Sequence, residues 1–320
     1  MTRILVLYYS QTGQLTRAAR AMLAPLAVRR DVEIVWQELK PLVPYPFPWS
    51  FFRFLDAFPE CVYLDPAPIE PVGFDGDAQF DLIVLCYQVW FLSPSPPIVA
   101  FLKTPAARVL KDRPAITLIA CRNMWLSAQE KIKMLLAERG ARLIDNVVLV
   151  DQGPPWATFV TTPRWLLTGK QDGFWGIFPA AGVSADAIAA AARFGRALVD
   201  SLDTLRDGAG GSLLRGLRAA KVNPGYVAGE KIAQRSFRLW GRLLRAIGPP
   251  GHPLRRATLL LYAVFLVTMI LTVLPISMLA RALLRPLLRG RLDAEVARLE
   301  LPSGSSNERM ARYARTNERP

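Results

Sequence analysis

The chain has 320 residues, 52% hydrophobic and 21% charged, a composition too apolar for an intrinsically disordered protein. Its net charge of +14 is uneven: residues 1–205 contain 20 basic and 19 acidic side chains, and residues 206–320 contain 20 and 7. The sole histidine, His252, lies in the basic part, which excludes a histidine-dependent catalytic triad from the neutral part. Three cysteines without a CxxC pair indicate neither a disulfide framework nor a zinc site, so we expect no metal.

Short apolar runs alternate with helix-length stretches in the neutral part, which predicts a parallel sheet covered on both faces. The predicted strands are Ile4–Tyr9, Val32–Leu39, Asp81–Tyr87, Ala115–Cys121 and Leu143–Val150. The predicted helices are Leu15–Leu26, Ile98–Leu110, Ser127–Glu138 and Ser184–Leu205, the last with Ser184 as its N-cap. We therefore predict one α/β domain over residues 1–205.

Two long insertions, 44–71 and 152–182, are rich in proline, glycine and aromatic residues. Segments of this length and composition either wall a binding site or pack on the sheet edge.

The basic part is predicted to contain a linker and amphipathic helix (206–256), a transmembrane or membrane-embedded helix (257–280) and a basic tail (281–320) that ends in disorder from Pro302. A buried core helix is the alternative interpretation of 257–280. Ala257–Ala280 has no charged residue, and about 36 Å of helix is enough to cross a bilayer core. Arginines flank this segment on both sides and leave its orientation open. Because Met1 leads directly into a strand, we expect a cytoplasmic domain attached to the inner (cytoplasmic) membrane.

A loop rich in polar residues, Ser10-Gln11-Thr12-Gly13-Gln14-Leu15, joins the first predicted strand to the first helix. Backbone N–H groups and hydroxyls at a helix start suit a phosphate, although the same residues are also ordinary helix caps. The loop resembles the phosphate loop of the flavodoxin family at Ser10, Thr12 and Gly13 and departs from it at Leu15, where a threonine is expected. The resemblance implies a flavodoxin-like, doubly wound five-stranded sheet with bound FMN.

Two further loops follow strands expected to lie beside the first. They supply Tyr87, Trp90 and Phe91, and Arg122, Asn123 and Trp125, as candidate flavin contacts. Core packing of the tryptophans and a surface ion pair for Arg122 are the alternatives.

These loops, with Pro46–Glu60, Ala128–Lys131 and Ala181–Ser184, resemble the flavodoxin-fold proteins of dialkylresorcinol biosynthesis, often labelled "dialkylresorcinol condensing enzyme". Condensation is excluded as this chain's own chemistry because its globular part has no histidine. The resemblance implies aromatisation of a dialkyl-cyclohexanedione to a dialkylresorcinol by hydride transfer to FMN. Candidate catalytic residues are the bases Tyr87 and Asp151 and the cation Arg122.

The expected partners are a lipid-like cyclic dione, anionic membrane lipids and a ketosynthase of the same pathway. Nucleic acid is not expected, because the arginines bracket an apolar segment. Two other functions remain open: an electron carrier or quinone reductase at the membrane, and a membrane scaffold without cofactor, which Leu15 would permit.

Overall fold

The computed structural model describes residues 1–206, 211–272 and 290–313. Five parallel strands form the sheet in the order β2-β1-β3-β5-β6, the order of a flavodoxin-like doubly wound fold, which confirms the predicted fold class. The strands are β1 (Thr2–Tyr8), β2 (Val32–Glu38), β3 (Leu82–Trp90), β5 (Pro114–Cys121) and β6 (Arg142–Val150). They match the five predicted runs, and a two-residue strand, β4 (Ser93–Pro94), pairs antiparallel with the end of β3.

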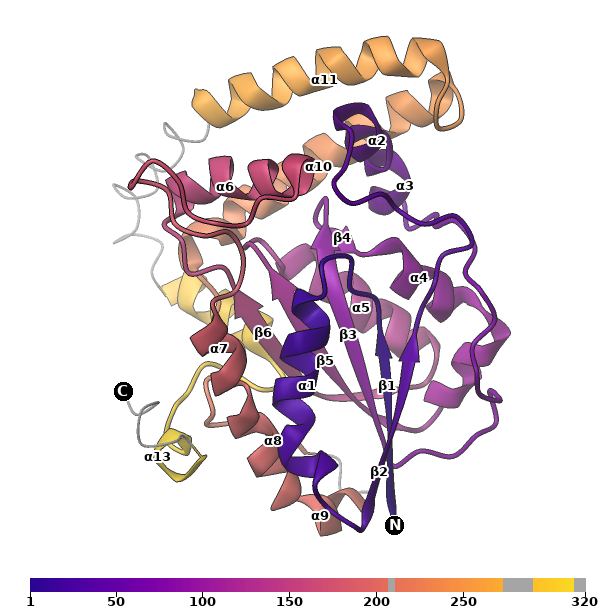
Figure 1. The fold of residues 1–320 in the computed structure, drawn as a ribbon, viewed down its shortest axis with the longest axis vertical. Helices are drawn as coiled ribbons and strands as arrows, with labels where there is room; N and C mark the ends of the chain where they lie inside the picture. Colours follow the sequence, from indigo (N-terminus) through magenta and orange to yellow (C-terminus); the bar gives the residue numbers. More distant parts are fainter. Residues whose placement is uncertain (207–210, 273–289, 314–320) are drawn as a thin grey trace.

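Helices cover both faces of the sheet (Figure 1). One face carries α1 (Gln14–Ala27), α7 (Ala185–Ala190), α8 (Ala192–Val199) and α9 (Leu202–Arg206); the other carries α4 (Pro96–Lys103), the 3-10 helix η1 (Pro105–Leu110) and α5 (Leu126–Glu138). The predicted helix 98–110 is divided at Thr104, ahead of Pro105, and 184–205 is divided into α7, α8 and α9. The Ser184 hydroxyl accepts a hydrogen bond from the Ala187 N–H (3.2 Å), so the predicted N-cap is confirmed.

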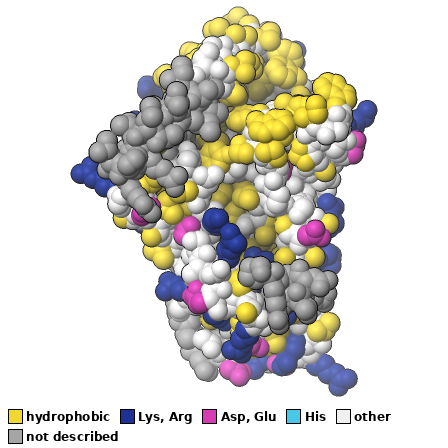
Figure 2. All heavy atoms as spheres, turned by 90° about the vertical axis from the view of Figure 1, so that its left-hand side faces the viewer, with side chains coloured by type: hydrophobic (Ala, Val, Ile, Leu, Met, Phe, Trp, Pro, Cys, Tyr) yellow, Lys and Arg dark blue, Asp and Glu magenta, His cyan; other side chains and the backbone are white. Residues whose placement is uncertain are grey.

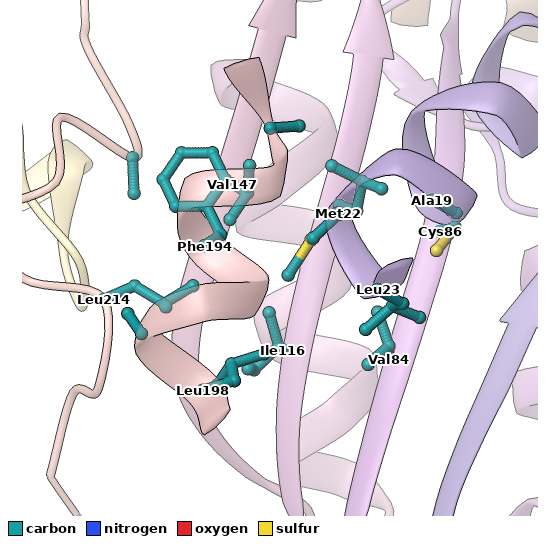
Figure 3. Packing of buried hydrophobic residues seen from close by; sticks show 14 of the residues in the cluster. Ala19, Met22, Leu23, Val84, Cys86, Ile116, Val147, Phe194, Leu198 and Leu214 are labelled. Atoms are coloured by element: carbon teal, nitrogen blue, oxygen red, sulfur yellow. The ribbon is translucent and has the colours of Figure 1, made fainter. Parts of the chain in front are cut away.

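Helices α1 and α8 lie unusually close together because a glycine separates them. Figure 3 shows Met22 of α1 and Phe194 and Leu198 of α8 over the sheet residues Ile116 and Val147. A Cβ atom on Gly195 would lie 1.9 Å from the Met22 carbonyl oxygen. Only a glycine therefore allows this approach, which seals the core on this face.

A group of helices lies over the carboxyl ends of the strands, and we call it the cap (Figure 1). The cap consists of α2 (Phe51–Asp56), α3 (Phe58–Val62), α6 (Pro155–Thr168), α10 (Pro224–Ile247) and α11 (Pro253–Leu271). Phe58 of α3 stacks on Tyr262 of α11 at 4.7 Å between ring centroids, and Trp240 of α10 lies 5.5 Å from the same ring. The apolar side of the predicted amphipathic helix thus packs on α3 and α11.

The basic C-terminal region folds back onto the sheet. Residues 211–222, part of the region predicted as linker and amphipathic helix (206–256), bury Leu214, Leu217 and Ala220, and the Ala219 carbonyl accepts from the Val148 N–H on β6 (2.8 Å). The linker itself was predicted at 207–211, of which 207–210 lie outside the described residues. Residues 302–313, predicted to be disordered, are ordered, and Ser303 is fully buried. Its hydroxyl donates to Asp145 (2.6 Å), and the Asp145 carboxylate also accepts from the backbone N–H groups of residues 213 and 214. The Ser212 hydroxyl donates to the same carboxylate (2.5 Å), so four donors compensate the burial of Asp145.

The predicted membrane helix 257–280 corresponds to α11 up to Leu271, and residues 273–280 lie outside the described residues. Among the described helices, α11 alone is long and apolar enough to cross a membrane, with mean hydropathy 1.8 and 17% of its apolar window buried. The upper part of the face in Figure 2 is correspondingly rich in hydrophobic side chains.

Candidate functional site

A cavity of about 150 Å³ lies at the carboxyl ends of β1, β3 and β5, beneath the cap. Strand order reverses between β1 and β3, and ligands of doubly wound sheets bind at this switch point. The phosphate loop, the β3 and β5 ends, and both insertions contribute to the walls. The lining residues are Gln11, Thr12, Gln14, Leu15, Trp49, Phe54, Gln88, Val89, Trp90, Phe91, Ala120, Cys121, Arg122, Asp151, Thr162, Trp165, Leu166 and Gly182.

The Ser10–Leu15 loop, predicted to bind phosphate, contains an unsatisfied hydroxyl on a residue that lines this cavity. The Thr12 Oγ1 atom is buried and has no hydrogen-bond partner. Gly13 precedes α1 with φ of 74°, and the Arg17 guanidinium lies 3.5 Å from where a Cβ on Gly13 would be. A buried hydroxyl without a partner costs free energy unless a ligand binds it, and a helix start with a nearby cation suits an anion.

Three other loop residues serve the protein itself. The Ser10 hydroxyl accepts from the Thr16 N–H (3.4 Å), inside the loop. The Gln11 side chain donates to the Pro46 carbonyl (2.9 Å) and accepts from Trp49 Nε1 (3.1 Å), which attaches the first insertion to the loop. Gln14 exchanges two hydrogen bonds with the backbone of Val183, so its side chain anchors the end of the second insertion. Leu15 is fully buried in the core at the cavity floor.

Aromatic rings form one side of the cavity. Trp49 and Trp90 meet edge to face at 5.4 Å between ring centroids, and Tyr45 contacts both. Phe91 packs on Phe54 at 4.9 Å. Both phenylalanines also pack on the cap cluster that contains Tyr262, so this wall is continuous with α11. Such a wall suits a flat ring and an apolar substituent.

The cation predicted at the β5 loop is present and largely buried. Arg122 Nε donates to the Thr158 hydroxyl (2.9 Å), and its guanidinium carbon lies 4.0 Å from the Phe159 ring centroid. Burial lowers the pKa of Arg122 from its usual value, although a guanidinium stays charged at neutral pH. Two contacts with α6 therefore fix a positive charge at the cavity wall.

The carboxylate of Asp151 also lines the cavity, but both of its oxygens bind backbone. One oxygen accepts from the Gly153 N–H (2.7 Å) and the other from the Gly182 N–H (2.6 Å). Asp151 thus connects the two ends of the second insertion through hydrogen bonds. It is the one carboxylate among the cavity-lining residues of the described structure.

Five predicted site residues do not line the cavity: Ser10 and Gly13 of the loop before α1, and Tyr87, Asn123 and Trp125. Tyr87 is fully buried on the α5 side, where its hydroxyl donates to Gln129 (2.6 Å), and burial raises its pKa well above the usual value. A fully buried phenol with a raised pKa is not a base for a bound substrate, so the prediction for Tyr87 is wrong. Trp125 packs in the core beneath α5, as the alternative interpretation held, and the Asn123 side chain accepts from the Met124 N–H (3.3 Å).

Several residues that line the cavity were not among the predicted site residues. Trp49, Phe54 and Trp165 lie in the two insertions that we interpreted as candidate walls, and the aromatic content of those segments was the available signal. Gln88 carried no such signal. Gln88 follows Tyr87 on β3, and neighbouring side chains of a strand point to opposite faces of the sheet. Gln88 therefore lines the cavity, whereas Tyr87 does not.

Comparison with known proteins gives structural neighbours alone. No family model matches the chain, and no curated protein sequence matches it significantly. A flavoprotein in complex with FMN from Lactobacillus acidophilus NCFM is similar at 15% identity and a TM-score of 0.35, covering 46% of this chain and 93% of that one. A flavodoxin, WrbA-like protein from Agrobacterium tumefaciens is similar at 12% identity and a TM-score of 0.33, covering 65% and 99%. The strand order itself identifies the fold as flavodoxin-like.

Proposed function

We propose that this protein is a membrane-attached, FMN-dependent oxidoreductase that aromatises a dialkyl-cyclohexanedione to a dialkylresorcinol. The observation that carries the proposal is the cavity at the strand switch point, with an unsatisfied hydroxyl at the phosphate loop and aromatic rings on its wall. The resemblance of the sequence to the flavodoxin-fold proteins of dialkylresorcinol biosynthesis supplies the substrate class.

The residues present fit FMN. The Thr12 hydroxyl and the N–H groups at the start of α1 would bind the phosphate, with Arg17 balancing its charge. Trp49 and Trp90 would hold the ring system, and Arg122 would face it from the β5 side. Bound FMN supplies a hydride acceptor.

The reaction removes one hydride and one proton from the ring, and enolisation then gives the resorcinol. The proton beside the two carbonyls is acidic enough for a weak base. Asp151 is the carboxylate in position to receive it, directly or through a water molecule. Arg122 would stabilise the negative charge that develops on a carbonyl oxygen, and the aromatic wall would exclude water from the hydride's path.

The enclosed position of the cavity favours an enzyme over an electron carrier. A carrier presents its flavin edge to a protein partner, whereas the cap here overlies the carboxyl ends of the strands (Figure 1). The contact of Phe54 and Phe91 with the α11 cluster gives alkyl chains an apolar route from a membrane. A ketosynthase is the partner that would supply the dione, and an inner membrane with anionic lipids is the proposed location.

A titration of the detergent-purified full chain with FMN, followed by flavin fluorescence, tests the cofactor. Thr12→Val removes one hydrogen bond to a charged phosphate and should weaken binding by about 10- to 150-fold. Thr16→Val, in the first turn of α1 and outside the cavity lining, is the matched control and should bind FMN as the unmodified protein does. Equal affinities for all three proteins would refute the phosphate assignment, and absence of FMN binding would favour the scaffold.

A single-turnover reaction then tests the chemistry. Anaerobic mixing of the FMN-loaded protein with a dialkyl-cyclohexanedione should bleach the flavin and yield one resorcinol per flavin. Reduction of quinones by the reduced protein without any dione oxidation would instead assign a quinone reductase.

A further inference from the structure

The apolar segment that begins with α11 is attached to the domain at both ends. On its N-terminal side, Arg255 is 1% exposed, donates to both carboxylate oxygens of Glu60 (3.0 and 2.6 Å) and donates to the Asp56 carbonyl (2.8 Å). This network attaches the first turn of α11 to α2 and α3.

Beyond the apolar segment, residues 290–313 contact the same domain. Leu299 is buried beside α5, and the Glu300 carboxylate accepts from the Val222 N–H (2.9 Å). Ser303 then binds Asp145 and Asn146 on β6, and the Tyr313 hydroxyl donates to Asp200 (2.9 Å). The two ends of the apolar segment are therefore on one side of any membrane that the segment enters.

Helix α11 also lies along the cap instead of projecting from it. Leu259 and Tyr262 are buried, and Phe265 packs on Trp240 at 5.2 Å between ring centroids. These contacts extend over about three turns, so a bilayer around α11 would have to displace the cap.

The opposite side of α11 is apolar and open. Leu261, Val264 and Leu271 follow helical spacing on this side and are 61%, 62% and 70% exposed. The same two helices of the cap also carry exposed positive charge, at Arg235, Arg238 and Arg242 of α10 and Arg256 of α11. An exposed apolar stripe with arginines nearby matches the interface of a bilayer that contains anionic lipids.

We propose that α11 attaches the protein to one leaflet with its exposed side in the lipid interface, and that the described residues before and after the apolar segment stay on one side of the bilayer. This inference rests on the membrane part of the proposed function and favours the membrane-embedded alternative over the transmembrane one, both of which the sequence left open. The cavity wall at Phe54 and Phe91 then lies one layer of side chains from the lipid.

Cysteine labelling in closed membrane vesicles tests the topology. Arg30→Cys reports the domain, and Asn307→Cys reports the chain beyond the apolar segment; both positions are exposed. A membrane-impermeant maleimide should label both variants in one vesicle orientation and neither in the other. The unmodified protein gives the background from the buried Cys61 and Cys86 and the half-buried Cys121. Labelling of the two reporters from opposite sides would overturn the proposal.

Flotation with vesicles of phosphatidylcholine and phosphatidylglycerol tests the surface. The pair Leu261→Glu and Val264→Glu should lower the partition coefficient at least about 100-fold, because burial of each apolar side chain contributes about a factor of ten or more. Val28→Glu, at an exposed valine remote from the cap, is the matched control and should bind as the unmodified protein does. Unchanged binding of the pair, or a dimer that the pair abolishes without lipid, would overturn the assignment of this surface to lipid. Neither measurement requires FMN or turnover, so failure here is distinct from failure of the proposed chemistry.

Discussion

The buried arginine of α11 gives a strong prediction about the cap. Arg255 is 1% exposed as a side chain, and its partners Asp56 and Glu60 are 16% and 23% exposed. Its Nε lies 2.6 Å from Oδ1 of Asp56 without hydrogen-bond geometry, so the bidentate contact with Glu60 provides most of the directional bonding. Removal of one partner from a buried ion pair costs about 3–5 kcal/mol. Because water reaches both carboxylates in part, we expect Arg255→Met to cost about 2–4 kcal/mol.

Hydrogen exchange of the detergent-solubilised chain measures this cost locally. The amides of the first three turns of α11 should exchange roughly 30- to 700-fold faster in Arg255→Met, because opening becomes easier by that free energy. Arg256→Met, on the exposed neighbour, should leave the same amides within about 0.5 kcal/mol of the unmodified protein. Equal protection in the two variants would refute the argument that the ion network holds α11 on the cap.

Three further predictions concern the domain itself. Asp145→Asn should lower the free energy of unfolding by about 3 kcal/mol in urea, because four donors face this carboxylate and an amide NH₂ cannot accept from them. Gly195→Ala should cost at least about 2 kcal/mol in the same assay, since its Cβ would meet a backbone oxygen at 1.9 Å; Gly211→Ala, which has open space around it, should be near neutral. Burial lowers the pKa of Lys131 to about 8 from the usual 10.5, so the unfolded chain binds more protons between those values and stability rises with pH there. Lys131→Met removes this titration. The free energy of unfolding of Lys131→Met, relative to that of the unmodified protein, should therefore fall by about 3 kcal/mol from pH 8 to 10.5. A constant difference across that range would contradict the lowered pKa of Lys131.

The strands and the place of the Ser10–Leu15 loop at the cavity could be predicted because their signals are local. A continuous apolar run such as Leu82–Cys86 is buried on both faces wherever it lies in a parallel sheet, so no knowledge of its partners is needed. The same holds for Thr12 and Gly13, which follow a strand and open a helix. The direction of Tyr87 was also within reach, because period-two alternation places it with Ile83 and Leu85 on the side that faces α5.

The remaining errors concern partners far away in sequence. Ser303 lies in a polar, serine-rich stretch that has the composition of a disordered tail, and its burial depends on Asp145, 158 residues earlier. Arg255 directly precedes an apolar segment, as arginines that flank membrane helices do. In the structure it nevertheless forms ion pairs with Asp56 and Glu60 of the cap. In both cases the composition is ambiguous, because a polar residue is buried only when a distant segment supplies the complementary group.

The position of the additions to the sheet explains how one fold combines an enclosed cavity with an apolar outer surface. Both insertions begin at loops after the carboxyl ends of strands, and α10 and α11 cover the same edge, so all four elements meet over the switch point. Their inner surfaces must be apolar to pack on one another, as Phe54, Phe91 and Phe58 do beneath Tyr262. The outer side of α11 has no further protein layer among the described residues, so its leucines and valines stay exposed. The same layer of aromatic rings that lines the cavity therefore supports the surface that we assign to lipid, and the substrate that we propose, with its alkyl chains, would have to pass only that layer.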